Sequence, residues 1–221
     1  MKMIEKKAPK EMKTIWHERG LSYDTLEQYL ANHNTNIVLV GDIHYQTANY
    51  VFQGNLVKTL KPEYFIHEFW EDQNQELGDM EIICGREMAR PLLEACLALN
   101  VKLKGCDYTT EQHLSLMDQI PDEVRCEYFA KHPNEFAGLE LIREPRERKM
   151  GKTILEYADK TSRPLIAAVG NCHLLPESYI YQEIEGRNAF LFYGSFIGSK
   201  NFHQKMSQGA CKVMRTKLLE L

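Results

Sequence analysis

The sequence predicts a three-layer α/β domain with a mainly parallel central sheet flanked by helices on both faces. Two short runs, Ile37–Val40 and Leu165–Val169, contain no polar residue, which is typical of strands buried on both faces of a parallel sheet. Segments with apolar residues at helical spacing alternate with strand-like segments along the chain. Both runs end in the same pattern, Gly-x-x-His, at Gly41–His44 and Gly170–His173.

The remaining elements follow from apolar spacing and from the positions of Pro and Gly. We expect strands at 37–41, 64–68, 101–106, 165–169 and 189–193. We expect helices at about 24–33, 46–60, 80–99 with a restart at Pro91, 109–160 with breaks near Pro121, Pro133 and Pro145, and 176–185. Residues 1–20 form an arm that either docks or stays mobile, and the basic segment of about 200–221 is expected to be a helical tail.

Length and composition exclude several classes of protein. No linker divides the 221 residues, so we expect a single domain over 1–221. A net charge of −4 gives no electrostatic case for binding nucleic acid. No apolar run reaches the roughly 20 residues of a membrane helix, and the charged start is unlike a secretion signal, so we expect a cytoplasmic protein without a membrane partner. Nothing in the sequence indicates a homo-oligomer.

Polar residues gather where the predicted strands end. Asp42 and His44 follow the first strand, Glu68 ends the second, Asp107 follows the third, and His173 follows the fourth. Because the carboxyl ends of parallel strands meet at one edge of the sheet, we expect these side chains to share a crevice. His44, Glu68 and His173, with Asp42, could hold a divalent metal such as Zn, Mn, Fe or Co. The same residues could also activate water without a metal.

Three neighbouring residues need separate interpretations. His67 precedes Glu68 on a strand and therefore points to the opposite face, as expected of a structural histidine. Cys172 adjoins His173, but adjacent side chains rarely meet, so we do not expect a Cys–His nucleophile. Arg146 lies near the start of a predicted helix, where the dipole disfavours a cation. We expect it either to pair with a carboxylate, to grip a substrate anion, or to pack on the surface.

The order and spacing of these residues resemble a superfamily that includes TraB/PrgY and TIKI proteins, ChaN-like proteins and erythromycin esterases. The residues that carry the resemblance are Gly41–His44, Glu68, Gly105–Asp107, Arg146 with Met150, and Gly170–His173 with Leu174. Asp42 and Tyr45 differ from the esterase branch, and Glu147 differs from the metalloprotease-like branch. The resemblance implies the same α/β fold, and its branches differ in chemistry: ester hydrolysis, metal-dependent proteolysis or haem binding.

We therefore expect a hydrolase that cleaves an ester or amide bond in a small-molecule or peptide substrate. The expected catalytic residues are His44, Glu68, His173, Arg146 and Asp107. Water is activated at His44 and Glu68, and the oxyanion is stabilised by Arg146 or by a backbone N–H near Gly41 or Gly170.

Two alternatives stay open. Asp42–His44 and Gly170–His173 also resemble parts of calcineurin-like metallophosphoesterases, but the Gly-Asp-x-x-Asp and Gly-His-x-His patterns of that family are absent. A non-enzymatic ChaN-like protein that binds haem is the second alternative, since a histidine in a crevice can serve as an axial ligand.

Overall fold

The computed structural model describes residues 20–21, 23–42, 46–68, 86–131, 139–175, 177–192 and 211–212. Its main sheet has five parallel strands in the order β4-β3-β5-β2-β6. The strands are β2 (Ile37–Asp42), β3 (Tyr64–His67), β4 (Lys102–Gly105), β5 (Leu165–Gly170) and β6 (Ala189–Phe192). A second, two-stranded antiparallel sheet pairs β1 (Gly20–Leu21) with β7 (Cys211–Lys212).

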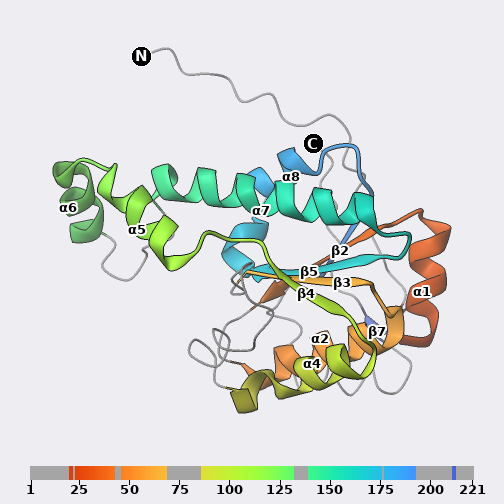
Figure 1. The fold of residues 1–221 in the computed structure, drawn as a ribbon. Coiled ribbons are helices and arrows are strands. Elements are labelled where there is room, and N and C mark those ends of the chain that lie inside the picture. Colours follow the sequence, from red (N-terminus) through yellow and green to blue (C-terminus); the bar gives the residue numbers. More distant parts are fainter. Residues whose placement is uncertain are drawn as a thin grey trace.

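Helices cover both faces of the main sheet, as Figure 1 shows. One face is covered by α1 (Tyr23–Asn32), α2 (Thr47–Leu60) and α4 (Arg86–Ala98), and the other by α7 (Glu140–Lys160) and α8 (Tyr179–Glu183). Val38 and Val40 of β2 point into the first layer, whereas Ile37 and Leu39 point into the second. The predicted three-layer α/β fold with a parallel sheet is therefore confirmed.

The two strands that carry the Gly-x-x-His pattern lie side by side in the centre of the sheet. β2 pairs with β5 from Ile37 opposite Leu165 to Asp42 opposite Gly170. All residues of both strands are buried, as the unbroken apolar runs predict. This register brings the segments that follow the two strands to the same edge of the sheet.

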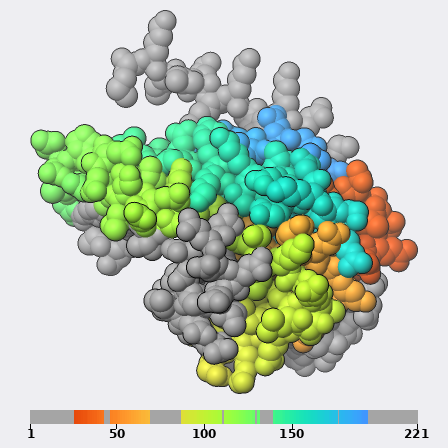
Figure 2. All heavy atoms as spheres, viewed as in Figure 1, coloured from red at the N-terminus to blue at the C-terminus, as the bar shows by residue number. Residues whose placement is uncertain are grey.

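Helices α5 (Thr110–Asp118) and α6 (Asp122–Lys131) form a lobe with the first part of α7, which extends away from the sheet (Figure 2). The lobe has a small apolar cluster of its own, made of Ile120, Leu139 and Ile142. Threonine 109 caps α5, since its hydroxyl accepts a hydrogen bond from the backbone N–H of Gln112. Among the described residues, no helix combines the length and the hydropathy needed to cross a membrane.

Three predictions about helices are wrong in detail. Proline 145 does not break a helix: α7 runs through it, as α4 runs through Pro91, and each proline is the sixth residue of its helix. The helix predicted over 176–185 is present but shorter, as α8 (Tyr179–Glu183), and an unpredicted 3₁₀ turn, η2 (Asn171–Leu174), precedes it. The described part of the tail predicted to be helical, 211–212, is strand β7.

The two prolines continue their helices because tertiary packing outweighs a single lost backbone hydrogen bond. Arg146 and Glu147 consequently lie in the second turn of α7 and not at its start. The helix dipole acts mainly on the first turn, so the positive charge of Arg146 needs another explanation.

Gly54 allows α2 and α4 to pack closely, because a Cβ atom at this position would lie 2.6 Å from the carbonyl oxygen of Pro91. We expect Gly54→Ala to lower the free energy of unfolding by about 1–3 kcal/mol, although alanine favours helix formation more than glycine does. Urea unfolding measures the change, with Lys58→Ala on the exposed side of the same helix as control. An unchanged unfolding midpoint for Gly54→Ala would contradict the close packing.

Candidate functional site

Strand β3 delivers two polar side chains to opposite faces of the sheet at its carboxyl end. His67 points towards α2, where its ring lies 6.2 Å from the ring of Tyr50. Glu68 follows the strand and points towards α7; only 5% of it is exposed. The alternation of side chains along a strand explains this division, as predicted.

The carboxylate of Glu68 joins β3 to β5 and to α7. Its Oε2 accepts a hydrogen bond from the backbone N–H of Gly170 at 2.5 Å. Its Oε1 accepts one from Nη2 of Arg146 at 3.2 Å and lies 3.3 Å from Nε2 of His173. A carboxylate that accepts this many hydrogen bonds is stabilised in its charged form.

His173 is held between two carboxylates. Its Nδ1 lies 3.1 Å from Oε1 of Glu147, and its Nε2 faces Glu68. The second oxygen of Glu147 accepts a hydrogen bond from the backbone N–H of Tyr179 at 2.9 Å. Burial alone would lower the pKa of His173, but hydrogen bonds with Cys172, Glu147 and Glu68 raise it to about 12. The ring is therefore an imidazolium at neutral pH.

Arg146 joins Glu68 to Asp107, the residue that follows β4. Its Nε lies 3.1 Å from both carboxylate oxygens of Asp107, and its Nη2 also donates to Asp107. Oδ2 of Asp107 lies 3.3 Å from Nε2 of His113. Burial alone would raise the pKa of Asp107, but the hydrogen bonds from His113 and Arg146 lower it below its usual value.

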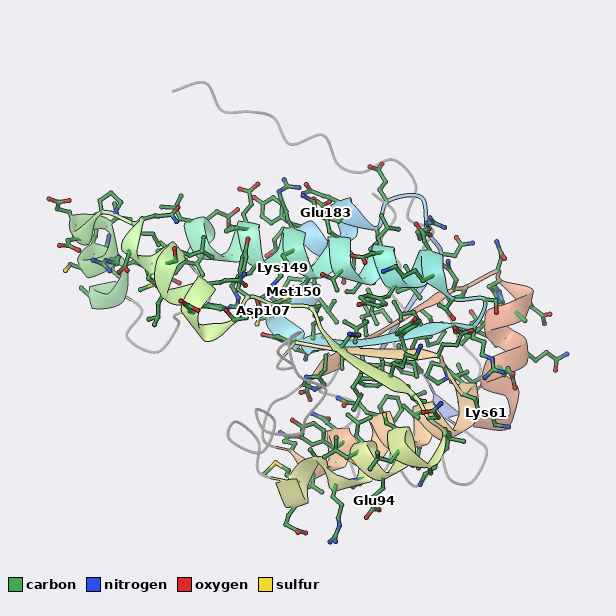
Figure 3. All side chains as sticks on the ribbon, in the orientation of Figure 1. Lys61, Glu94, Asp107, Lys149, Met150 and Glu183 are labelled. Carbon is green, nitrogen blue, oxygen red and sulfur yellow. The ribbon has the colours of Figure 1, made fainter. Side chains whose placement is uncertain are left out.

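Lys149 adds a further cation at this end of the sheet. Its Nζ donates to the backbone carbonyl of Asp107 at 2.5 Å and lies 4.8 Å from the centre of the Tyr108 ring. Figure 3 shows Lys149 on α7 directly above Asp107. One turn of α7 thus contributes Arg146, Glu147 and Lys149 to the same group of charges.

We call Glu68, Asp107, Arg146, Glu147 and His173 the charge network. All except Asp107 are at least nine-tenths buried, and Asp107 is half-buried. Taking such groups out of water costs several kcal/mol per charge before pairing is counted, and a well-packed apolar cluster would often stabilise a fold as well. A buried charge network at the carboxyl edge of a parallel sheet is therefore a candidate functional site.

The structure does not bring Asp42 into this network. Asp42 ends β2 on the face of the sheet that α2 covers, where its Oδ1 accepts a hydrogen bond from Asn49 at 3.0 Å. Its Oδ2 lies 3.8 Å from Nε2 of His67. Asp42 is an even-numbered residue of β2, like Val38 and Val40, and so shares their face.

The described residues do not by themselves fit a bound metal or haem. Among them, no group of three or more His, Cys, Asp or Glu side chains is arranged to hold a metal ion. His173 faces carboxylates with both ring nitrogens and so presents neither nitrogen to a haem iron. His44, a predicted metal ligand and catalytic residue, lies outside the described residues.

Sequence reasoning did not assign a site role to Glu147 or His113. Glu147 is fully buried and holds His173, but nothing in the sequence shows that this residue of α7 will contact a histidine 26 positions later. The capping pair Thr109 and Gln112 is a sequence signal for the start of α5. It would have placed His113 in the first turn of this helix, close to Asp107. Cys172 is exposed.

Removing Arg146 should destabilise the fold strongly, because it leaves two carboxylates close together without their shared cation. We expect Arg146→Met to lower the free energy of unfolding by about 3–5 kcal/mol in urea unfolding. Arg148→Met is the control: Arg148 is half-buried and pairs with Glu144 and Glu183, so its loss should cost about 1 kcal/mol or less.

Neutralising the carboxylates tests the cause of this effect. Asp107→Asn added to Arg146→Met should restore part of the lost stability, since it removes one of the two uncompensated charges. If the double variant is no more stable than Arg146→Met, the loss comes from packing of the arginine stem and not from charge.

The raised pKa of His173 predicts a specific dependence of stability on pH. The stabilisation from the charged ring is present in full below the ordinary pKa of 6.5 and is lost as the pH rises towards 12. Between about pH 7 and pH 9 the free energy of unfolding should fall by about 2.5 kcal/mol more in the natural protein than in His173→Gln.

NMR of the imidazole nitrogens measures the same charge directly. The ring of His173 should stay doubly protonated at pH 9, whereas the exposed His33 serves as the reference histidine in the same spectrum. Titration of the His173 ring near pH 6.5 would contradict the arrangement between two carboxylates.

Comparison with known proteins supports the fold. No protein-family model matches the chain, and no curated protein matches it in sequence. Among solved structures, the chain is similar to ChaN of Campylobacter jejuni, whose structure is described as showing cofacial haem binding. The superposition has a TM-score of 0.50 and covers 79% of this chain and 90% of the ChaN chain. At 10% sequence identity the likeness is one of fold. This chain has a ChaN-like α/β fold.

Proposed function

We propose that this protein is a hydrolase that cleaves an ester or amide bond in a small-molecule or peptide substrate at the carboxyl edge of its sheet. The observation that carries the proposal is the charge network, in which one imidazolium and one guanidinium are fixed by three carboxylates. Charges held rigidly in a site with little water stabilise a developing oxyanion more than mobile charges in water do.

The two histidines have different chemical roles in this proposal. His173 stays charged at neutral pH, so it cannot accept a proton from water and serves as a cationic donor. Glu68 accepts hydrogen bonds from Gly170 and Arg146 and faces His173, so both of its carboxylate oxygens are already engaged. In this proposal His44 removes the proton from the attacking water, and Glu68 keeps the cations in place.

The oxyanion of the tetrahedral intermediate would then be stabilised by His173 or Arg146. The backbone N–H of Gly170, an alternative donor in the sequence-based hypothesis, already donates to Glu68. In the described residues this donor is therefore engaged, which favours the two cationic side chains for the role.

Haem binding is the second candidate, and it rests on the ChaN-like fold together with the haem that the C. jejuni protein binds. Against it, the described site is lined by charged groups, whereas a haem pocket needs apolar walls and an imidazole nitrogen directed at the iron. The hydrolase proposal accounts better for the groups present.

We expect turnover in a panel of ester, amide and phosphoester substrates, assayed with and without added Mn, Co or Zn. Glu68→Gln, His173→Gln and His44→Gln should each lower the rate by at least about two orders of magnitude, the usual scale for a lost acid–base or oxyanion group. Initial rates under saturating and limiting substrate separate effects on kcat and on KM.

Two matched variants control for the substitutions themselves. Glu63→Gln and His33→Gln make the same substitutions at exposed positions near the amino ends of the strands and should leave the rate unchanged. Circular dichroism of every variant establishes that it folds. A folded His173→Gln variant with full activity would contradict the proposal.

The same panel separates the alternatives. Turnover of phosphoesters alone would favour a metallophosphoesterase. Absence of turnover, together with a saturable Soret band on titration with haem, would favour a haem-binding protein.

A further inference from the structure

A cavity of about 550 Å³ lies at the amino ends of the strands, away from the charge network. It is lined by α1, by the turn between α1 and β2, by the end of α2 and by the turn that precedes β5. Figure 2 shows these segments side by side, and Figure 3 shows Lys61 at the other end of the strands from Asp107. Its volume is in the range of small-molecule sites.

Charged groups of both signs face this cavity. Glu27 comes from α1, Lys61 follows α2, and Arg163 precedes β5. The guanidinium of Arg163 is fixed by a hydrogen bond from its Nη1 to the backbone carbonyl of Lys61 at 2.9 Å. Within the described part of the chain, Glu27 and Lys61 form no ion pair, unlike the charged pairs along α4, α6 and α7.

A buried hydroxyl adds a second observation. Thr35 lines the cavity, and only 5% of it is exposed. Its Oγ1 makes no hydrogen bond with any residue that the structure describes. An unsatisfied buried hydroxyl costs about 1–3 kcal/mol, and such groups in native proteins commonly contact water or a ligand.

The carboxyl ends of two helices also influence which charges the cavity favours. The carboxyl ends of α1 and α2 both meet this cavity, at Asn34 and Lys61, which adopt left-handed conformations with φ of 49° and 45°. Carbonyl groups at helix ends carry partial negative charge and favour a cation. A simple anion would therefore meet Arg163 and Lys61 but would be repelled by the helix ends and by Glu27.

We propose that this cavity binds a small zwitterion, of the size of an amino acid or a dipeptide. Its carboxylate would pair with Arg163 and Lys61, and its ammonium group with Glu27 and the carbonyl ends of the helices. Leu60 and Pro164 provide an apolar part of the wall for a side chain. This proposal does not depend on the hydrolase proposal, because the two sites occupy opposite edges of the sheet.

The test uses the dipeptide alanyl-leucine and two blocked forms, one acetylated at the amine and one amidated at the carboxylate. Calorimetric titration of the full chain should show saturable binding of the free dipeptide. Each blocked form should bind at least about tenfold more weakly, because it loses one charge and the hydrogen bonds made to it.

Variants of the protein test which residues bind the carboxylate of the dipeptide and which bind its ammonium group. Arg163→Gln should lose most of the preference for the free acid over the amide, and Glu27→Gln most of the preference for the free amine over the acetylated form. Thr35→Val, of similar shape, should weaken binding of all three compounds without lowering the free energy of unfolding. Lys58→Gln, exposed on α2 and outside the cavity lining, is the control and should bind as the natural protein does.

Two results would overturn the proposal. One is the absence of saturable binding of the free dipeptide at millimolar concentrations. The other is equal binding of the free and acetylated forms by the natural protein, which would indicate a site for a simple carboxylate.

Discussion

A single carboxylate, that of Glu68, connects the parts of the fold that come together at the carboxyl edge of the sheet. It accepts a hydrogen bond from the backbone of Gly170 on β5, and it faces Arg146 on α7 and His173 on η2. Because Glu68 is buried, its charge requires these partners, and they in turn require it. The position of α7 over the sheet therefore depends on electrostatic pairing as well as on apolar packing.

The same pairing fixes the protonation of the site. Arg146 and His173 together balance two of the three carboxylates in the charge network. His113 contacts the carboxylate of the half-buried Asp107, and Lys149 donates to its backbone carbonyl. Hydrogen bonds with Glu147 and Glu68 help to keep His173 charged, which explains why the pKa of His173 rises although burial opposes it. A site of this kind carries fixed charges through the whole physiological pH range.

The sequence was sufficient to predict the layers and the strands. Two apolar runs without polar interruption indicated central strands, and β2 and β5 are the central pair. The period of two along β3 predicted the opposite directions of His67 and Glu68. The same rule, applied to β2, would have placed Asp42 with His67 and not with Glu68.

Other features depend on contacts between distant residues, which local pattern does not contain. A break was expected at Pro145, with a new helix starting there, yet α7 runs through this residue. The partnership of Glu147 with His173 joins residues 26 positions apart, and its only local sign was the departure of Glu147 from a family pattern. The position of Arg146 is explained by its ion pairs with Glu68 and Asp107 and not by the helix dipole, because it lies beyond the first turn of α7.

The strand order has a consequence for the way the chain is made. β2 lies between β5 and β6, so both of its neighbours come from residues 165–192, more than 120 positions later in the chain. During synthesis, both edges of β2 stay unpaired until residues 165–192 have emerged. Pairings of this range fold slowly and leave strand edges exposed to other chains. The nascent protein is thus most vulnerable to aggregation just before the residues that close its charge network arrive.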